Sequence, residues 1–235
     1  MTVAKYMRVD LKRINLAIDP HKKLIPDTDE IKDLLDIQIN LLNEVIQYGI
    51  PKVTEDGEYV WECDRPIQAE LYKPYTKFEK KSVGINGQAL DMYSKQLLNP
   101  DKGGFEYTYG ERIVPNIDEV MKLLIHHKNT RRAVINISEN SDRKCGFMPC
   151  MQQILLTIDY NGYLQMDITF RSHDILSAWY ANVYALLHLQ DELCNRYNFH
   201  PGILRIISFR PHFYPKRDAE ALKTLGANPK QFYNE

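Results

Sequence analysis

In the stretch Cys150-Met-Gln-Gln-Ile-Leu-Leu-Thr-Ile-Asp-Tyr-Asn-Gly-Tyr-Leu-Gln-Met-Asp-Ile-Thr-Phe-Arg-Ser-His-Asp174, an apolar run, a turn and an alternating run follow one another. The run Ile154-Leu-Leu-Thr-Ile158 is typical of a buried strand. Asp159-Tyr-Asn-Gly162 supplies a turn of the kind that closes hairpins. The apolar residues of the return strand alternate with polar ones, at Leu164, Met166, Ile168 and Phe170. This period of two predicts a hairpin with one face in a core.

The rest of the chain predicts helices and further strands around this hairpin. A helical apolar stripe covers residues 31–47 and ends before Gly49 and Pro51. Further helices are predicted at 117–126 and 177–197, and strands at 133–137 and 203–209. Residues 51–83 are dense in charge, tyrosine and proline without a clean period, which indicates in part a loop over a site. With no internal repeat or linker, the sequence predicts one α+β domain over 1–235.

The composition excludes several classes of protein. A net charge of −1 favours neither nucleic acid nor a membrane surface as partner. The chain contains no apolar run near the roughly 20 residues that span a bilayer, and no secretory signal at Met1. Four cysteines at irregular spacing do not resemble a disulfide framework. Cys145-x4-Cys150 and His126-His127 fit no tetrahedral zinc pattern, so no metal site is expected. A cytoplasmic protein with reduced thiols is predicted.

A few residues in this pattern are suited to chemistry. Cys150 begins a strand, and Arg171, one hairpin away, is a source of the positive charge that lowers a thiol pKa. The alternative is an inert packing cysteine, since cysteine is among the most buried residue types. Arg131-Arg132 can bind a phosphate bidentately, or can be two solvated charges at a loop end. Ser172, His173 and Asp174 cannot form a hydrolase triad, because adjacent residues on an extended chain point to opposite sides.

Taken in order, these pieces resemble the thymidylate synthase superfamily, which includes the pyrimidine-nucleotide hydroxymethylases. The resemblance covers roughly residues 66–214 and is most specific from Cys150 onward. The fragments that carry it are Ile67-Gln-Ala-Glu70-Leu71, similar to the family helix with the catalytic glutamate; Tyr107-Thr-Tyr109-Gly110-Glu-Arg112; Asn129-Thr130-Arg131-Arg132; Arg171-Ser172-His173-Asp174 with Ala178 and Asn182; and His212-Phe-Tyr214. The resemblance implies a thymidylate synthase-like fold, with a mixed sheet at a homodimer interface and helices on its other face.

The reaction of the family implies a role for each matching residue. The Cys150 thiolate is expected to add to C6 of a pyrimidine nucleoside monophosphate, which makes C5 a nucleophile toward 5,10-methylene-tetrahydrofolate or a methanopterin relative. Glu70 is expected to act as general acid and base, and Tyr109 to assist proton removal from C5. The same match implies the residues that bind the substrate. Arg171 and Ser172, with Arg131 and Arg132 of the other subunit, are expected to bind the phosphate. Asp174 and Asn182 are expected to bind the base, and His212 and Tyr214 the sugar.

Asn182 favours dUMP as the substrate. Its carboxamide can pair with both N3–H and O4 of uracil, whereas family members that act on cytosine can carry aspartate there. Departures from the family concern Met151 in place of histidine, Ala178 in place of glycine, and the few residues after Tyr214, too few for the long segment that closes over the folate. The N-terminal phosphate residue is open among Arg13, Lys22 and Lys23.

Three functions follow from the sequence. The leading hypothesis is methylation of dUMP to dTMP. The second is hydroxymethylation of dUMP, dCMP or CMP, which results if water reaches the exocyclic methylene before hydride does. The third is a non-catalytic nucleotide-binding protein that kept the phosphate cluster.

Overall fold

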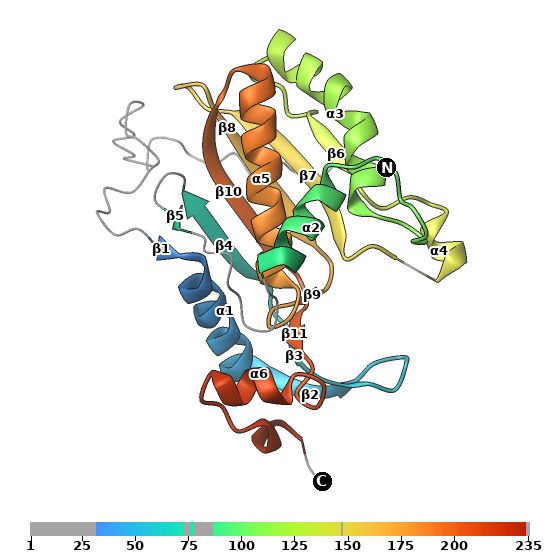
Figure 1. Cartoon of the computed structure of the whole chain (residues 1–235), viewed down its shortest axis with the longest axis vertical. Helices are drawn as coiled ribbons and strands as arrows, with labels where there is room; N and C mark the ends of the chain where they lie inside the picture. The colour runs from blue at the N-terminus through green and yellow to red at the C-terminus, as the bar shows by residue number, and fades with distance from the viewer. Residues whose placement is uncertain (1–31, 73–75, 78–86, 147, 234–235) are drawn as a thin grey trace, which may run out of the picture.

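A computed structural model describes residues 32–72, 76–77, 87–146 and 148–233. Helices and strands follow one another along the chain as shown in Figure 1. The strands are β1 Lys32–Asp33, β2 Gly49–Val53, β3 Tyr59–Cys63, β4 Ile67–Tyr72, β5 Thr76–Lys77, β6 Val134–Asn136, β7 Met151–Ile158, β8 Tyr163–Phe170, β9 His173–Asp174, β10 His200–Ser208 and β11 Pro211–Phe213. The helices are α1 Leu34–Tyr48, α2 Gly87–Leu97, α3 Tyr109–His126, α4 Asp142–Cys145, α5 Trp179–Tyr197, α6 Ala219–Thr224 and the 3₁₀ helix η2 Pro229–Phe232.

The central sheet has five strands in the order β4-β10-β8-β7-β6. Strands β7 and β8 form the predicted antiparallel hairpin, with Ile154 opposite Ile168. Gly162 closes its turn at φ 84°, a conformation that costs glycine little. Strand β10 lies parallel to β8 and antiparallel to β4, so the sheet is mixed. The prediction of an α+β fold with a mixed sheet is confirmed.

One face of the central sheet packs against helices. The alternating apolar residues of β8 are fully buried, as predicted, at Leu164, Met166, Ile168 and Phe170. Helix α5 crosses this face and α2 packs on α5 (Figure 1). Gln190 ties α5 to the sheet, because its side-chain amide donates to the carbonyls of Leu164 and Gly202. The helix is therefore fixed over the strands.

A smaller sheet joins two strands from the first half of the chain with two from the second half. Its order is β2-β3-β11-β9. Strand β11 runs parallel to β9 and places His212 opposite Asp174. On its other side β11 pairs antiparallel with β3. This sheet places the His212-x-Tyr214 segment beside the end of the hairpin.

Helix predictions are confirmed with changed bounds, but the interpretation of residues 51–83 was wrong in part. Helix α3 begins eight residues before the predicted 117, because Thr108 caps it by accepting the N–H of Glu111 at 3.1 Å. Strands β2, β3 and β4 occupy much of the region expected to be irregular. Strand β2 is largely exposed, so its sequence carries no period of two and only the pairing with β3 defines it.

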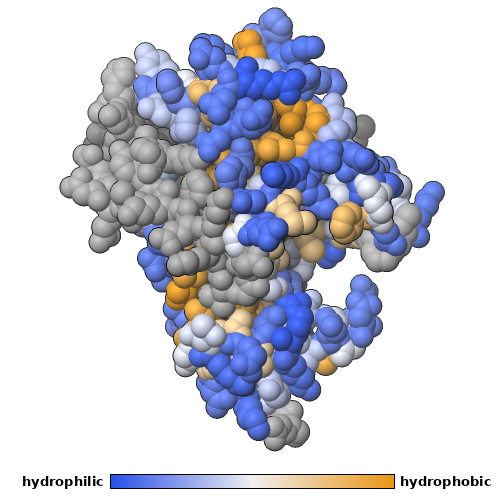
Figure 2. Space-filling view, in the orientation of Figure 1, coloured by the Kyte–Doolittle hydropathy of each residue, from blue (hydrophilic) through white to orange (hydrophobic). Residues whose placement is uncertain are grey.

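The surface in Figure 2 is predominantly hydrophilic, with small separate apolar areas. Across the residues that the structure describes, no helix is long and apolar enough to cross a membrane. Within the same residues, no group of three His, Cys, Asp or Glu side chains is arranged to hold a metal ion.

Candidate active site

Cys150 lies directly before β7, where the hairpin holds it next to Arg171. The carbonyl of Cys150 accepts the backbone N–H of Arg171 at 2.9 Å. The guanidinium of Arg171 turns back along the chain and donates to the carbonyls of Pro149 at 3.1 Å and Met148 at 2.7 Å. Cys150 is partly buried against the core. The hairpin therefore brings the backbones of Cys150 and Arg171 together, while the guanidinium is bonded to backbone carbonyls beside the thiol.

Tyrosine side chains gather around the thiol. Burial raises the pKa of Tyr93, Tyr107 and Tyr109, and the nearby charge of Cys150 raises each further. The hydroxyl of Tyr109 accepts the backbone N–H of Met151, 3.3 Å away. All three phenols therefore stay protonated near neutral pH, and Tyr109 is held at the first residue of β7. The proximity of Tyr109 to Cys150 matches the position predicted for it.

The thiol of Cys150 is not activated in the free protein. Burial raises its pKa, the positive charge of Arg171 opposes this, and the carboxylate of Asp174 adds to it. Arg171 thus acts in the expected direction, but the balance leaves the pKa above its ordinary value. The reason is that burial outweighs a guanidinium that is itself exposed and bonded to backbone carbonyls.

We expect the alkylation of Cys150 by iodoacetamide to rise with pH to a midpoint above that of an ordinary thiol, about 8.5. Only the thiolate reacts, and its fraction increases as pH rises through the pKa. Arg171→Met should move the midpoint further up, because it removes the one favourable charge, whereas Arg196→Met, a distant surface change, should not. The readout is the mass of the peptide that contains Cys150. A midpoint that is lowered by Arg171→Met would contradict this account.

Asp174 forms the turn between β9 and α5. One carboxylate oxygen accepts the N–H groups of Leu176 and Ser177 at 3.2 and 3.0 Å. The other oxygen accepts from the Ser177 hydroxyl and from Arg217. Burial alone would raise the pKa of Asp174, but these hydrogen bonds and the charge of Arg217 hold it below its ordinary value. Asp174 is thus ionised, and both of its carboxylate oxygens hold the loop in place.

Asn182 lies in the first turns of α5 and is 8% exposed. Its Oδ1 accepts from the hydroxyl of Tyr93, and its Nδ2 lies 3.1 Å from Nε2 of His173. Nδ1 of His173 lies 2.8 Å from Oγ of Ser208. Tyr93 also lies near Cys150, so the amide of Asn182 and the thiol belong to one site.

His173 predicts an acid-sensitive stability. Burial lowers its pKa from 6.5 to about 3. Below pH 6.5 the unfolded chain binds a proton that the folded protein cannot, so stability is full above 6.5 and falls as pH decreases. Between pH 7 and 5 we expect a loss of about 2 kcal/mol from this group. Urea denaturation at several pH values gives the free energy of unfolding of the wild type and of His173→Phe. Between pH 7 and 5 this free energy should fall more steeply for the wild type, and an equal dependence on pH would contradict the buried neutral ring.

His212 and Tyr214 lie beside Ser172. Nδ1–H of His212 donates to the carbonyl of Arg210 at 3.0 Å, and the Ser172 hydroxyl lies 3.5 Å from the same nitrogen. Nε2 of His212 is then left as an acceptor. The Tyr214 ring meets the His212 ring edge-on, with centroids 5.2 Å apart. Ser172 therefore lies beside His212 rather than His173, which agrees with the exclusion of a triad.

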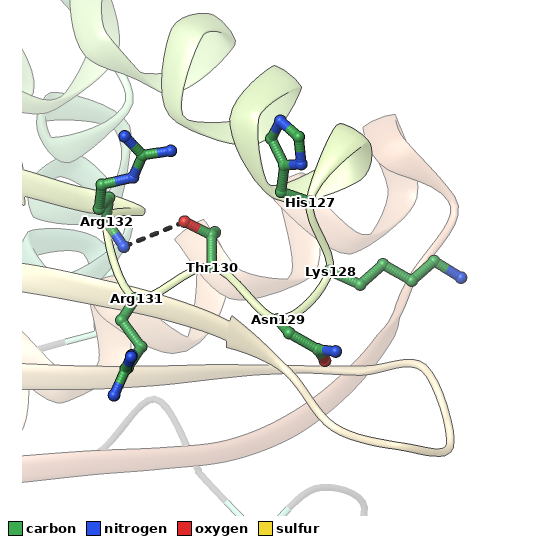
Figure 3. A pocket seen from close by; sticks show the side chains of 6 residues that line it. All are labelled: His127, Lys128, Asn129, Thr130, Arg131 and Arg132. Carbon is green, nitrogen blue, oxygen red and sulfur yellow. Dashed lines mark hydrogen bonds between the residues drawn. The ribbon is translucent and has the colours of Figure 1, made fainter.

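Arg131 and Arg132 lie apart from this cluster, in the loop between α3 and β6. Both are exposed, and the N–H of Arg132 donates to Oγ1 of Thr130 at 3.2 Å. The loop lines a cavity of about 550 Å³ from residues His127, Lys128, Asn129, Thr130, Arg131 and Arg132. The two guanidiniums point to opposite sides of the chain (Figure 3). Within the protomer, the structure leaves them on the surface, separate from the contacts that surround Cys150.

Glu70 is not on a helix, which corrects the prediction for its segment. It lies on β4, where its carboxylate accepts from Arg205 at 2.8 Å and from Tyr72 at 2.5 Å. The hydrogen bond from Arg205 lowers the pKa of Glu70, and that from Tyr72 adds to this. Period-two burial along β4, with Ala69 and Leu71 inside, decides for a strand. The acid–base role of Glu70 remains a prediction, and these contacts do not connect it to the thiol.

Several site residues were not identified from the sequence, and some candidates lie outside the described residues. Arg217 holds Asp174 and lies over the Tyr214 ring, 4.2 Å from its centroid, and nothing in the spacing of the sequence marked it. Tyr93 was missed because helix α2 was not predicted. Arg13, Lys22 and Lys23 fall outside the residues that the structure describes. Cys63 and Cys194 are buried free thiols, as expected of packing cysteines.

Comparison with known proteins gives one family. The thymidylate synthase family model matches residues 30–233. Three archaeal relatives carry the name "Putative thymidylate synthase". The protein of Methanothermobacter marburgensis is 31% identical over 60% of this chain and 65% of its own length, so the match spans just under two thirds of it. Those of Methanosarcina acetivorans and Methanocaldococcus jannaschii are 28% and 29% identical, over 78% and 74% of this chain and 87% and 88% of theirs.

The match includes every element of the site, from the tyrosines near the thiol to the His212-x-Tyr214 strand. It agrees with the mixed α+β fold and with the order of the fragments in the sequence. The chain belongs to the thymidylate synthase family and is similar to its archaeal members.

Proposed function

We propose that this protein transfers a one-carbon unit to C5 of dUMP and forms dTMP, with Cys150 as the nucleophile. The observation that carries the proposal is the single site in which the thiol, Arg171, the tyrosines and the amide of Asn182 meet. Family membership supports a transferase that acts on a pyrimidine nucleotide. The absence of a membrane-crossing helix among the described residues agrees with a cytoplasmic location, which is also proposed.

The residues around the thiol suit the covalent route. Addition of the Cys150 thiolate to C6 breaks the C5–C6 double bond and makes C5 a carbon nucleophile. When bound, 5,10-methylene-tetrahydrofolate or a methanopterin relative supplies the methylene carbon and, for a methyl product, a hydride. Tyr109 is placed to assist removal of the C5 proton, because its hydroxyl contacts the residue after Cys150. Loss of that proton and of the thiolate restores the double bond and frees the enzyme.

The polar residues suit the rest of the nucleotide. Asn182 offers one acceptor and one donor, which match N3–H and O4 of uracil. Nε2 of His212 and the hydroxyl of Tyr214 suit the sugar hydroxyl. Arg171 and Ser172 suit the phosphate from within the protomer. The segment around Asp174 offers backbone groups to the base, and its carboxylate holds that segment in place.

We propose that a second copy of the chain supplies the rest of the positive charge that binds the phosphate. Arg131 and Arg132 are exposed and lie away from the thiol of their own protomer. In an isologous dimer, each subunit presents the same surface to the other, so a loop that is remote in one protomer can reach the partner's site. We propose a homodimer in which the face of the central sheet away from α5 forms the interface and these arginines are exchanged.

Hydroxymethylation is the second candidate, and Met151 favours it. The residue after the nucleophile is histidine in methylating members, whereas Met151 is fully buried and offers no hydrogen-bond donor to a substrate. We infer that the side chain after the nucleophile influences whether hydride or water reaches the exocyclic methylene.

Product identification tests the proposal. Purified protein is mixed with methylene-tetrahydrofolate and with dUMP, dCMP or CMP, and the products are separated and weighed. We expect dTMP from dUMP. A 5-hydroxymethyl pyrimidine without any methyl product would replace the first candidate by the second. Tight nucleotide binding without any product would favour a non-catalytic homologue.

A further inference from the structure

The amide of Asn182 is held on both sides by residues that take no part in the proposed chemistry. Tyr93 of α2 donates to Oδ1, and His173 of β9 faces Nδ2 at 3.1 Å. A carboxamide can turn over and exchange its oxygen and nitrogen, and the two orientations present opposite patterns to a base. Uracil needs an acceptor for N3–H and a donor for O4, whereas cytosine needs a donor for N3 and an acceptor for its amino group.

The contacts of His173 match one of the two orientations of the Asn182 amide. The ring is 1% exposed and stacks on Phe170, with centroids 3.8 Å apart at 11°. A neutral imidazole has one donor and one acceptor nitrogen. Nδ2 of Asn182 lies 3.1 Å from Nε2, so in this arrangement Nε2 accepts, and Nδ1 carries the proton and donates to Oγ of Ser208, 2.8 Å away.

Tyr93 enforces the same orientation from the other side. Its O–H donates to Oδ1 of Asn182. Turning the amide over would remove that acceptor and leave the Tyr93 proton without this partner in a partly buried position, which costs free energy. The turned amide would also point Oδ1 at the unprotonated Nε2 of His173.

We propose that His173 and Tyr93 are positioning residues that lock the amide of Asn182 in the orientation that reads uracil and rejects cytosine. Ser208 contributes as the partner of His173 Nδ1, which leaves Nε2 to face Asn182. The remaining hydrogen of Nδ2 and the remaining lone pair of Oδ1 then contact the base. This inference rests on the proposed function, since it assigns the source of the dUMP preference.

The test is the ratio of the dissociation constants for dCMP and dUMP, measured by calorimetry without the carbon donor. We expect Tyr93→Phe and His173→Phe each to lower the ratio by about tenfold or more, because either change lets the amide turn over. The phenylalanine at 173 keeps the ring stack on Phe170. Ser208→Ala, which frees the tautomer, should lower the ratio by a smaller factor in the same direction.

Tyr184→Phe is the matched control. Tyr184 lies on α5 near Asn182 and its hydroxyl donates to Asp91 of α2 at 3.2 Å, so the change removes a similar contact between the same two helices. Its ratio should equal that of the wild type. A merely structural role would weaken the binding of both nucleotides equally and leave the ratio unchanged, which would overturn the lock. If His173→Phe does not fold, Tyr93→Phe decides the outcome.

Failure of the lock and failure of the proposed function give different results. A wild type that binds neither nucleotide would refute the proposed function. A wild type that prefers dUMP, with variants that keep the full preference, would refute only the lock. A wild type that prefers dCMP would overturn the lock, because the orientation held by Tyr93 and His173 does not match cytosine, and it would replace uracil by cytosine in the proposed reaction.

Discussion

Cys150→Ala should abolish the release of tritium from [5-³H]dUMP, with a loss of at least about a thousandfold. Exchange or loss of the C5 hydrogen requires that the double bond be opened at C6, and the thiol is the group that the site offers for this step. The binding of dUMP should change little, because the contacts assigned to phosphate, base and sugar remain. The measurement is the tritium that appears in water, beside calorimetry of dUMP binding.

The matched controls are Cys63→Ala and Cys194→Ala, which change buried free thiols outside the site. Both should release tritium at the wild-type rate if they fold, since both side chains are buried in the core. Tritium release that persists in Cys150→Ala would contradict the covalent route. Loss of dUMP binding in the same variant would instead show that the residue holds the pocket open.

The double variant Arg131→Ala, Arg132→Ala should weaken dUMP binding by about a hundredfold or more, since two charge-assisted contacts to a phosphate dianion are removed. The fold should be unaffected, because both side chains are exposed in the protomer. Arg196→Ala is the matched control. Its guanidinium pairs with Asp118 at 2.9 Å on the surface, and its loss should leave dUMP binding unchanged.

Mixing tests whether these arginines act across subunits. At a dUMP concentration near the wild-type Kd, we expect neither the double variant nor Cys150→Ala to show appreciable activity alone. A mixed dimer has one complete site, made of Cys150 from one subunit and both arginines from the other, so random exchange should restore about a quarter of the wild-type activity. No recovery after subunit exchange, verified by mass spectrometry of the mixed dimer, would contradict the shared site.

The fold was predictable from the sequence where one face of a strand is fully buried and the other is not. The β7–β8 hairpin has a turn with Gly162 and a fully buried alternating face, so local chemistry and tertiary packing agree. The prediction for region 51–83 failed because β2 is a largely exposed edge strand, so its pairing with β3 and not an apolar period defines it. Helix α2 was missed since only Leu90, Ser94 and Leu97 are buried, so no continuous apolar stripe marks it.

The site was predictable where motif residues are adjacent in sequence. The segment from Arg171 to Asp174 and the pair His212 and Tyr214 meet because β9 and β11 are parallel neighbours. Glu70 was placed on a helix by the resemblance, although Ile67, Ala69 and Leu71 alternate with polar residues, which is the period of a strand. Tyr93 and Arg217 reach the site from elements whose position is set by packing, which a single sequence does not reveal.

The most direct measurement of the central claim is the mass of the protein after incubation with 5-fluoro-dUMP and methylene-tetrahydrofolate. Fluorine at C5 cannot leave as a cation, so the bridged intermediate should persist through denaturation. The account predicts one nucleotide and one folate added per chain, on the peptide that contains Cys150. Binding of 5-fluoro-dUMP without a covalent adduct, or an adduct at Cys63 or Cys194, would contradict it.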